Sequence, residues 1–259
     1  INNDNPNNFI NMRKIVLTAV AVMLAMCAVA QNNVAEGKKY YEAERYDKAL
    51  PYLIKAVKEG DADSKARLAT MIFTMQVPDY SMDRHNALMM LDEAIDAGSV
   101  LAMERKGFCT LNMGNDTKED KMKGIELLIK ASEAGSSDAS FNLFKVYRDG
   151  IKTYSDGEVC VEQDPELSLK YIQKCEEQNG LEGVAYVGWF RLEGTHGYEK
   201  DADAAANAIL GAYNRDHRMF AGNCLEPGRA LVRYLKDNGK TTVSAPIEAL
   251  LKKYHPTEY

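Results

Sequence analysis

The chain has 259 residues, of which 46% are hydrophobic and 27% charged, and this composition is typical of a globular protein with a sizeable core. Its 32 basic and 38 acidic residues leave a formal net charge of −6, which argues against the clustered Lys and Arg of a phosphate-binding surface, so we expect no nucleic-acid partner. Abundant Ala, Leu, Lys and Glu favour a helical chain over collagen-like, disordered or disulfide-dense classes.

The N-terminal segment has the pattern of an export signal. Two basic residues precede a mostly apolar run over residues 15–30, which ends on the small-x-small sequence Ala-Val-Ala that a signal peptidase accepts. The run is short for a membrane span. We therefore expect residues 1–30 to be upstream residues plus a signal peptide, with the true start at Met12 and cleavage after Ala30. The mature chain would then be bacterial, periplasmic or secreted, and without a membrane span.

Two alternatives to cleavage remain open for the N-terminal segment. The apolar run could stay attached as an anchor helix. Alternatively, Cys27 could carry a lipid, although Met26 stands where Gly, Ala or Ser normally precedes a lipidated cysteine.

The cysteines leave the disulfide pattern open. The four cysteines after Cys27, an even number, would allow three disulfide pairings in an oxidising compartment. These are Cys109, Cys160, Cys175 and Cys224. We expect Cys109 and Cys175 to be small core residues, because free cysteine is often buried.

Residues 31–216 contain five related segments. Each carries two small residues seven positions apart, which return to the same helical face after two turns and let another helix approach closely. The pairs are Ala49 and Ala56, Ala87 and Ala94, Gly124 and Ala131, Ser168 and Cys175, and Ala205 and Ala212. Successive segments begin 37 to 44 residues apart. Such spacing predicts helical hairpins that stack on one another to bury their apolar faces.

Each segment also carries signals for where its helix starts and stops. Residues that tolerate a left-handed backbone follow four positions after each second small residue: Gly60, Gly98, Gly135, Asn179 and Asp216. An aspartate that could cap the helix precedes each segment: Asp47, Asp83, Asp120, Asp164 and Asp201. Pro165 suits the first helical position. The intervening residues leave room for antiparallel partner helices at about 34–45, 62–76, 100–113, 137–149 and 181–193.

One of these hairpins resembles a known repeat. The segment DASFNLFKVYRDG is similar to the SEL-like repeat (SLR), a longer relative of the tetratricopeptide repeat with the pattern A-x3-L-G-x2-Y-x2-G. Its matching residues are Ala139, Leu143, Tyr147 and Gly150, and Phe144 replaces the usual Gly.

Neighbouring units extend the resemblance over about residues 34–216. The next unit matches at Gly183, Val187, Gly188 and Gly194, and the preceding one keeps Ala102 and Gly107. We therefore expect an all-α, right-handed superhelix (α/α solenoid) of about five helical hairpins. A resemblance in fold says almost nothing about biochemical function.

Two regions fall outside the repeat. Residues 151–163 are expected to form an inserted loop, either a partner contact or a tolerated surface loop. Helical patterns at about 227–238 and 246–254 predict a C-terminal cap over residues 217–259, which would shield the last hairpin.

No catalytic motif is found in the sequence. It lacks HExxH, GxSxG, a glycine-rich phosphate loop and paired Cys/His spacing. His85, His196, His217 and His255 lie far apart and are expected to be solvated polar residues. We therefore expect a non-enzyme with no catalytic residue, no metal and no cofactor.

The predicted function is that of an exported scaffold or adaptor that binds a protein or peptide. The resemblance implies that the first helix of each hairpin lines a concave groove, with ten candidate residues. These are Lys38, Tyr41, Thr70, Thr74, Glu104, Phe108, Phe141, Lys145, Arg148 and Trp189. Alternatively, Phe108 and Phe141 pack between neighbouring first helices. The competing function is an envelope module that binds a glycan or peptidoglycan fragment, and a hydrolase is a distant third.

Overall fold

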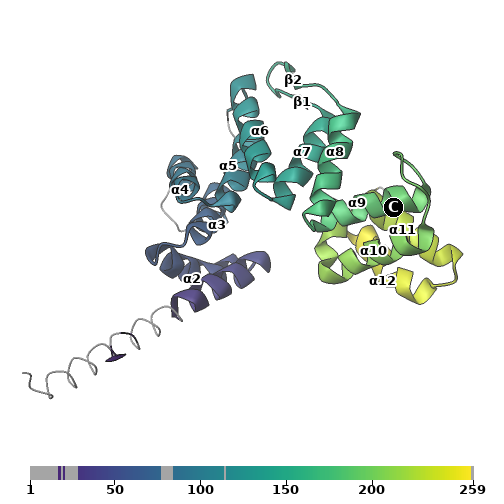
Figure 1. Ribbon diagram of the computed structural model, residues 1–259, viewed down its shortest axis with the longest axis horizontal. Helices are drawn as coiled ribbons and strands as arrows, with labels where there is room; N and C mark the ends of the chain where they lie inside the picture. Colours follow the sequence, from purple (N-terminus) through teal and green to yellow (C-terminus); the bar gives the residue numbers. More distant parts are fainter. Residues whose placement is uncertain (1–16, 19, 21–28, 77–83, 114, 258–259) are drawn as a thin grey trace, which may run out of the picture. The chain divides into compact units, whose positions relative to one another are not determined.

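The computed structural model describes residues 17–18, 20, 29–76, 84–113 and 115–257. These residues divide, within one helix, into two compact units, Ile1–Arg105 and Lys106–Tyr259. Both units are built from helices, apart from one short pair of strands (Figure 1). The predicted start at Met12 and most of the predicted signal lie outside the described residues.

The first unit consists of paired helices. Residues 29–42 are helical, and they are followed by α2 (Tyr46–Lys58), α3 (Ala62–Phe73), α4 (Arg84–Asp96) and the start of α5 (Val100–Met113). Helix α3 packs against both α2 and α4. A core of small and branched residues joins α3, α4 and α5: Ala66, Ala69, Leu91, Ala94 and Ala102.

The second unit continues the repeat and ends in two extra helices. After the rest of α5, its elements are α6 (Lys118–Glu133), α7 (Ser137–Asp149), β1 (Ile151–Lys152), β2 (Val159–Val161), α8 (Pro165–Glu177), α9 (Leu181–Glu193), α10 (Ala202–Arg215), the 3₁₀ helix η1 (His217–Ala221), α11 (Leu225–Asp237) and α12 (Thr241–Tyr254). Each helix from α6 to α9 packs against the next. The all-α hairpin architecture that the repeat predicts is confirmed.

Residues 151–163 are more ordered than the expected loop. Strands β1 and β2 pair antiparallel, with Ile151 opposite Val161. Asp164 ends the insertion by donating its backbone N–H to the Tyr147 carbonyl at 2.8 Å. The insertion is therefore a short β-hairpin closed onto the end of α7.

The predicted stripe of small residues lies at the helix contacts. All ten members are buried, with Ala49, Ala94 and Ala131 wholly inaccessible. At Gly124 an added Cβ would lie 2.7 Å from the Leu111 backbone nitrogen. Only a small residue permits such an approach of two backbones, so the stripe is where the helices of the repeat pack.

Helix ends follow the sequence signals in most repeats. Gly60, Gly98, Gly135 and Asn179 all have positive φ, between 61° and 101°, as predicted for residues that stop a helix. Asp216 also ends its helix, since α10 stops at Arg215, but it does so without the left-handed backbone that was predicted. Its backbone is extended, with φ −148°, because its carboxylate accepts the Arg218 N–H at 2.9 Å and caps η1 instead.

Helix starts agree less well. Asp164 and Asp201 cap α8 and α10 by accepting backbone N–H groups at 2.9 and 3.2 Å, and Pro165 occupies the first turn as predicted. Asp47 lies inside the first turn of α2, which has no side-chain cap. Thr117 replaces Asp120 as the cap of α6, because its hydroxyl accepts the Asp120 N–H at 3.2 Å. Asp83 lies outside the described residues.

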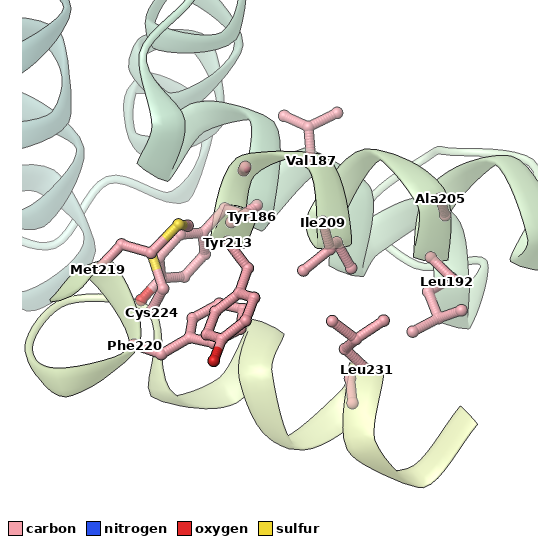
Figure 2. Close-up of a cluster of buried hydrophobic side chains, with 14 of the residues drawn as sticks. Tyr186, Val187, Leu192, Ala205, Ile209, Tyr213, Met219, Phe220, Cys224 and Leu231 are labelled. Carbon is pink, nitrogen blue, oxygen red and sulfur yellow. The ribbon is translucent and has the colours of Figure 1, made fainter. Parts of the chain in front are cut away.

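The C-terminal helices share one core with the repeat. The predicted helices at 227–238 and 246–254 correspond to α11 and α12, each of which starts earlier than expected. Phe220 of η1 is wholly buried against Tyr213 of α10, with ring centroids 5.3 Å apart. Figure 2 shows these rings beside Cys224, and the same buried cluster includes Leu231 of α11.

The described cysteines are all free thiols. Cys109, Cys175 and Cys224 are buried and Cys160 is partly exposed, which confirms the core positions predicted for Cys109 and Cys175. Burial raises the pKa of Cys175 to about 12 and that of Cys224 well above its ordinary value. Both thiols therefore stay protonated at neutral pH, and a protonated thiol is a poor nucleophile.

The difference in burial between Cys160 and the other cysteines predicts selective labelling. At pH 8 we expect a maleimide to modify Cys160 in the folded protein at least tenfold faster than Cys175 or Cys224, because a raised pKa and burial both suppress the thiolate. Mass spectrometry of peptides after timed labelling measures the three rates. In denaturant the rates should become similar, and equal rates in the folded protein would contradict the buried positions.

Candidate functional site

The second unit contains a cavity of about 340 Å³. Helices α7, α8 and α9, the turn after α9 and the start of α11 provide its walls. It reaches the surface beside Arg148, Pro165 and His196, which are exposed. Pockets of about 300 Å³ and more are in the range that holds ligands, so this cavity is the candidate binding site.

Helical spacing explains which side chains face the cavity. Helix α7 contributes Phe144 and Arg148, which are four residues apart and so lie on one face. Helix α8 contributes Pro165, Ser168, Leu169 and Ile172, which have the same periodicity.

The third wall is aromatic. Helix α9 contributes Tyr186, Trp189 and Phe190. The Tyr186 ring lies 4.9 Å from that of Phe144, and the Trp189 ring lies 5.5 Å from that of Phe190. His196 stacks on Phe190 with centroids 4.0 Å apart. A connected series of rings therefore lines the cavity from α7 to the turn after α9.

Arg148 is the cation of the site, and its charge is balanced. Its Nε and Nη2 groups donate to the two carboxylate oxygens of Asp149 at 2.8 and 2.7 Å, and its guanidinium lies 5.0 Å over the Phe144 ring. The contact with Asp149 raises the pKa of Arg148, so the cation persists. Its Nη1 donates to the Tyr186 hydroxyl at 3.3 Å.

Tyr186 and Trp189 are fixed in different ways. The Tyr186 hydroxyl donates to the Asn223 carbonyl at 3.0 Å, and burial raises the pKa of this tyrosine to about 12, so it is neutral. The Trp189 Nε1 atom is buried and has no acceptor among the described residues. A buried donor without a partner costs about 1–3 kcal/mol, which makes this indole the least satisfied polar group of the site.

The reactive side chains of the cavity do not form a catalytic group. Ser168 donates its hydroxyl to the Phe144 carbonyl at 3.3 Å, His196 contacts the Thr195 hydroxyl, and Glu226 pairs with Arg229 at 2.8 Å. Nucleophilic catalysis needs the nucleophile within reach of its base. Because each group is bonded elsewhere, the geometry supports binding rather than acyl transfer.

Phe144 distinguishes the hairpin in which the cavity lies. The equivalent positions of the preceding and following first helices carry Gly107 and Gly188. An added Cβ at Gly107 would lie 2.9 Å from the Gly124 carbonyl oxygen, and one at Gly188 would lie 2.7 Å from the Ile209 side chain. Those two contacts leave no room for a side chain, whereas α7 places an aromatic ring there. The departure from the repeat pattern therefore coincides with the site.

The predicted groove residues of the second unit differ in where they lie. Arg148 and Trp189 line the cavity. Phe141 is only 4% exposed and contacts the Phe144 and Tyr186 rings, so it packs in the core, as the alternative expectation held. The Lys145 ammonium lies 5.1 Å over the Phe141 ring, and Phe108 is half-buried.

In the first unit the predicted groove residues also differ in exposure. Thr70 and Glu104 are 8% and 1% exposed, so their side chains are not offered to a partner; the Thr70 hydroxyl donates to the Ala66 carbonyl at 2.8 Å. Lys38 is exposed, while Tyr41 and Thr74 are half-buried. A groove role for these three residues stays a prediction.

Several lining residues were missed from the sequence, in particular Phe144, Tyr186, Phe190 and His196. The sequence did carry one signal, the Phe at a position where the repeat has Gly. The resemblance implies partner contacts only for the first helix of each hairpin, so it does not indicate the α8 side of the cavity.

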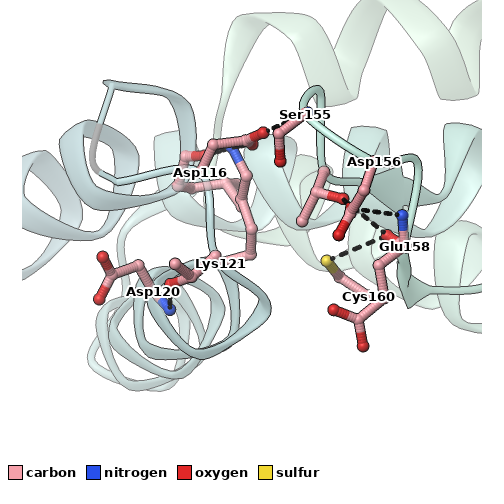
Figure 3. A network of polar contacts seen from close by, with 10 residues as sticks. Asp116, Asp120, Lys121, Ser155, Asp156, Glu158 and Cys160 are labelled. Carbon is pink, nitrogen blue, oxygen red and sulfur yellow. Dashed lines mark hydrogen bonds and ion pairs between the residues drawn. The ribbon is translucent and has the colours of Figure 1, made fainter.

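A second polar feature holds the β-hairpin to α6. The Asp116 carboxylate accepts the Ser155 N–H at 2.7 Å and pairs with Lys121 at 3.3 Å (Figure 3). The Lys121 ammonium lies 4.9 Å over the ring of Tyr154, which is 84% exposed. These contacts link the β-hairpin to the start of α6. Among the described residues no cluster of His, Cys, Asp or Glu could hold a metal ion.

Two solved structures are similar to this chain. The stacked hairpins define a helical repeat protein. A Sel1 repeat protein from Oxalobacter formigenes is similar at 21% identity and a TM-score of 0.49, over 86% of this chain and 97% of that one. A protective antigen present in uropathogenic Escherichia coli strains, displaying an SLR fold, is similar at 20% identity and a TM-score of 0.53, over 90% of this chain.

This chain has the SLR fold and spans 47% of the length of that antigen. The resemblance seen in the sequence is thereby confirmed at the level of the fold. No protein-family model and no curated protein matches the sequence. In the parts of the chain that the structure describes, no helix is long and apolar enough to cross a membrane.

Proposed function

We propose that this chain is an exported scaffold or adaptor that binds a protein or peptide partner through the cavity of its second unit. The observation that carries the proposal is an aromatic-walled cavity that reaches the surface at Arg148. Trp, Tyr, Phe and Arg dominate the energetics of protein interfaces, and here they gather in one place.

A protein partner accounts for the cavity better than a glycan or a hydrolase substrate does. Sugar hydroxyls need several polar partners, and the polar groups of the lining are largely bonded to one another or to their neighbours. A hydrolase needs a nucleophile joined to its base, and Ser168 donates to a backbone carbonyl instead. The proposed function therefore includes no catalytic step.

Site-specific photo-crosslinking tests this function. Leu169 lines the cavity and is half-buried, so a benzoylphenylalanine at this position would contact any occupant. We expect ultraviolet light to join it to a protein of the cell envelope, and Trp189→Ala to reduce the yield severalfold.

The matched control places the same probe at Tyr154, which is exposed on the hairpin and is not part of the cavity lining. The probe at Tyr154 should give less of the crosslinked protein product than the probe at Leu169. Equal yields from the two positions, or no protein product from Leu169, would count against the cavity as the binding site.

Export is a separate part of the proposal and has its own test. The chain from Gln31 onward retains the contact of Asn33 with the Glu59 carboxylate, with distances of 2.9 and 3.2 Å, so cleavage after Ala30 leaves the first hairpin intact. N-terminal sequencing of protein recovered from the envelope or medium should begin within a few residues of Gln31. Recovery of an intact Met12 terminus from that fraction would contradict cleavage.

A further inference from the structure

We infer that the cavity holds one large, neutral, apolar side chain from within a peptide, and that the peptide backbone carbonyl accepts a hydrogen bond from Arg148. The inference rests on the proposed function and specifies the chemistry of the partner. Three features of the site lead to it: the apolar walls, the balance of charge and the position of the remaining donors.

The walls favour an apolar occupant. Phe144 and Phe190 are 3% and 4% exposed, and Ile172 is inaccessible to solvent, so an occupant that enters the cavity leaves water and contacts carbon atoms. Burial of an apolar side chain is favourable in such a place, whereas a polar group without a partner is penalised. The flat rings also match the faces of an aromatic or branched side chain.

The charges favour a neutral occupant. Arg148 is paired with Asp149, and Glu226, which also lines the cavity, is paired with Arg229. The two pairs cancel, so neither a free carboxylate nor a cation would find an uncompensated opposite charge. A chain terminus or a quaternary ammonium group is therefore a poorer match than an internal residue of a peptide.

The remaining donors favour an acceptor at the mouth. A guanidinium has five N–H groups, and the bonds of Arg148 to Asp149 and Tyr186 use three of them. The Arg148 side chain is 42% exposed, so its other N–H groups can reach a ligand. A backbone carbonyl next to the buried side chain has the right chemistry and the right place along a peptide.

The lone tryptophan gives a direct assay. Because the chain has one Trp, its indole N–H produces a single signal in a ¹⁵N–¹H correlation spectrum of the labelled full chain. We expect N-acetyl-L-phenylalanine N-methylamide to shift this signal saturably. N-acetyl-L-phenylalanine, which carries a carboxylate, should bind at least about fivefold more weakly, and N-acetylglucosamine and tetramethylammonium should cause no saturable shift.

Two variants assign the effect to the named contacts. Arg148→Met keeps the length of the side chain and removes its donors, so the methylamide should bind about fivefold more weakly, as for the loss of one hydrogen bond. Arg233→Met is the control, because Arg233 is an exposed arginine that is also paired with a carboxylate, that of Glu193, outside the cavity. It should leave binding unchanged. Phe144→Leu keeps most of the volume of the cavity wall. It should change the affinity for the methylamide, while the spectrum remains that of a folded protein.

The outcomes separate this inference from the proposed function. A saturable shift with N-acetylglucosamine or tetramethylammonium, a carboxylate ligand that binds as well as the methylamide, or no shift with the methylamide would each overturn the inference. If the Leu169 probe still crosslinks a partner in that case, the binding function stands and only the ligand chemistry is wrong. If crosslinking fails as well, both the inference and the proposed binding function are wrong.

Discussion

Gly183→Val is expected to destabilise the second unit by about 3 kcal/mol or more, at the upper end of the range for overpacking. A Cβ at Gly183 would lie 2.3 Å from the Glu176 backbone nitrogen and 2.6 Å from the Cys175 carbonyl carbon. These are backbone atoms of α8, so no side-chain rotation relieves the clash and α9 must move. Denaturation in urea, followed by circular dichroism, measures the loss.

The same substitution at Gly211 is the matched control. Gly211 lies inside α10, is exposed, and has no atom within 4 Å of an added Cβ. Because glycine weakens a helix interior, Gly211→Val should change the free energy of unfolding by no more than about 0.5 kcal/mol. Equal losses for the two variants would show that α8 and α9 do not approach as closely as the structure has them.

Phe220→Ala is expected to cost about 3–5 kcal/mol, the usual range for removing a buried aromatic side chain. Phe220 is wholly buried, stacks on Tyr213 and lies 3.2 Å from the position of a Cβ added at Gly228. Its ring therefore joins α10, η1 and α11 (Figure 2). The loss should appear as a lower midpoint of thermal unfolding.

The comparison for Phe220 is Tyr254→Ala in α12. Tyr254 is 49% exposed, so its removal should cost less than about 1 kcal/mol. If Phe220→Ala unfolds only α11 and α12 and leaves the repeat helices at full stability, the C-terminal helices are a separate module. A single cooperative transition at lower temperature would instead support a cap that shares the core of the repeat.

The repeat could be predicted from the sequence because its signals are local and recur. Ala94 and Ala131 are predicted to face a neighbouring helix from spacing alone, and the structure buries both completely. Helix starts were harder, since Thr117 and Asp120 are both good caps within one turn and only the path of the chain decides between them. The β-hairpin was missed because its strands have two and three residues, too short for a periodic pattern.

The cavity could be predicted only in part. Arg148 and Trp189 line the cavity, and the resemblance places both on the partner-facing side of first helices. Pro165 and Glu226 were not predicted, since they come together only when α8 and the start of α11 pack beside α7 and α9. One residue did carry the information, because Phe144 breaks the repeat pattern where the cavity lies. In this chain the departure from the repeat pattern thus coincides with the candidate site.

Acrylamide quenching of Trp189 fluorescence tests most directly whether a partner occupies the cavity. The chain has one Trp, half-buried in the cavity wall, so all tryptophan emission of the free protein comes from the site. We predict that acrylamide quenches the Trp189 fluorescence of the free protein. The partner identified by crosslinking, once purified and added without crosslinking, should lower the quenching constant at least twofold. An unchanged quenching constant in the saturated complex would mean that the partner binds elsewhere.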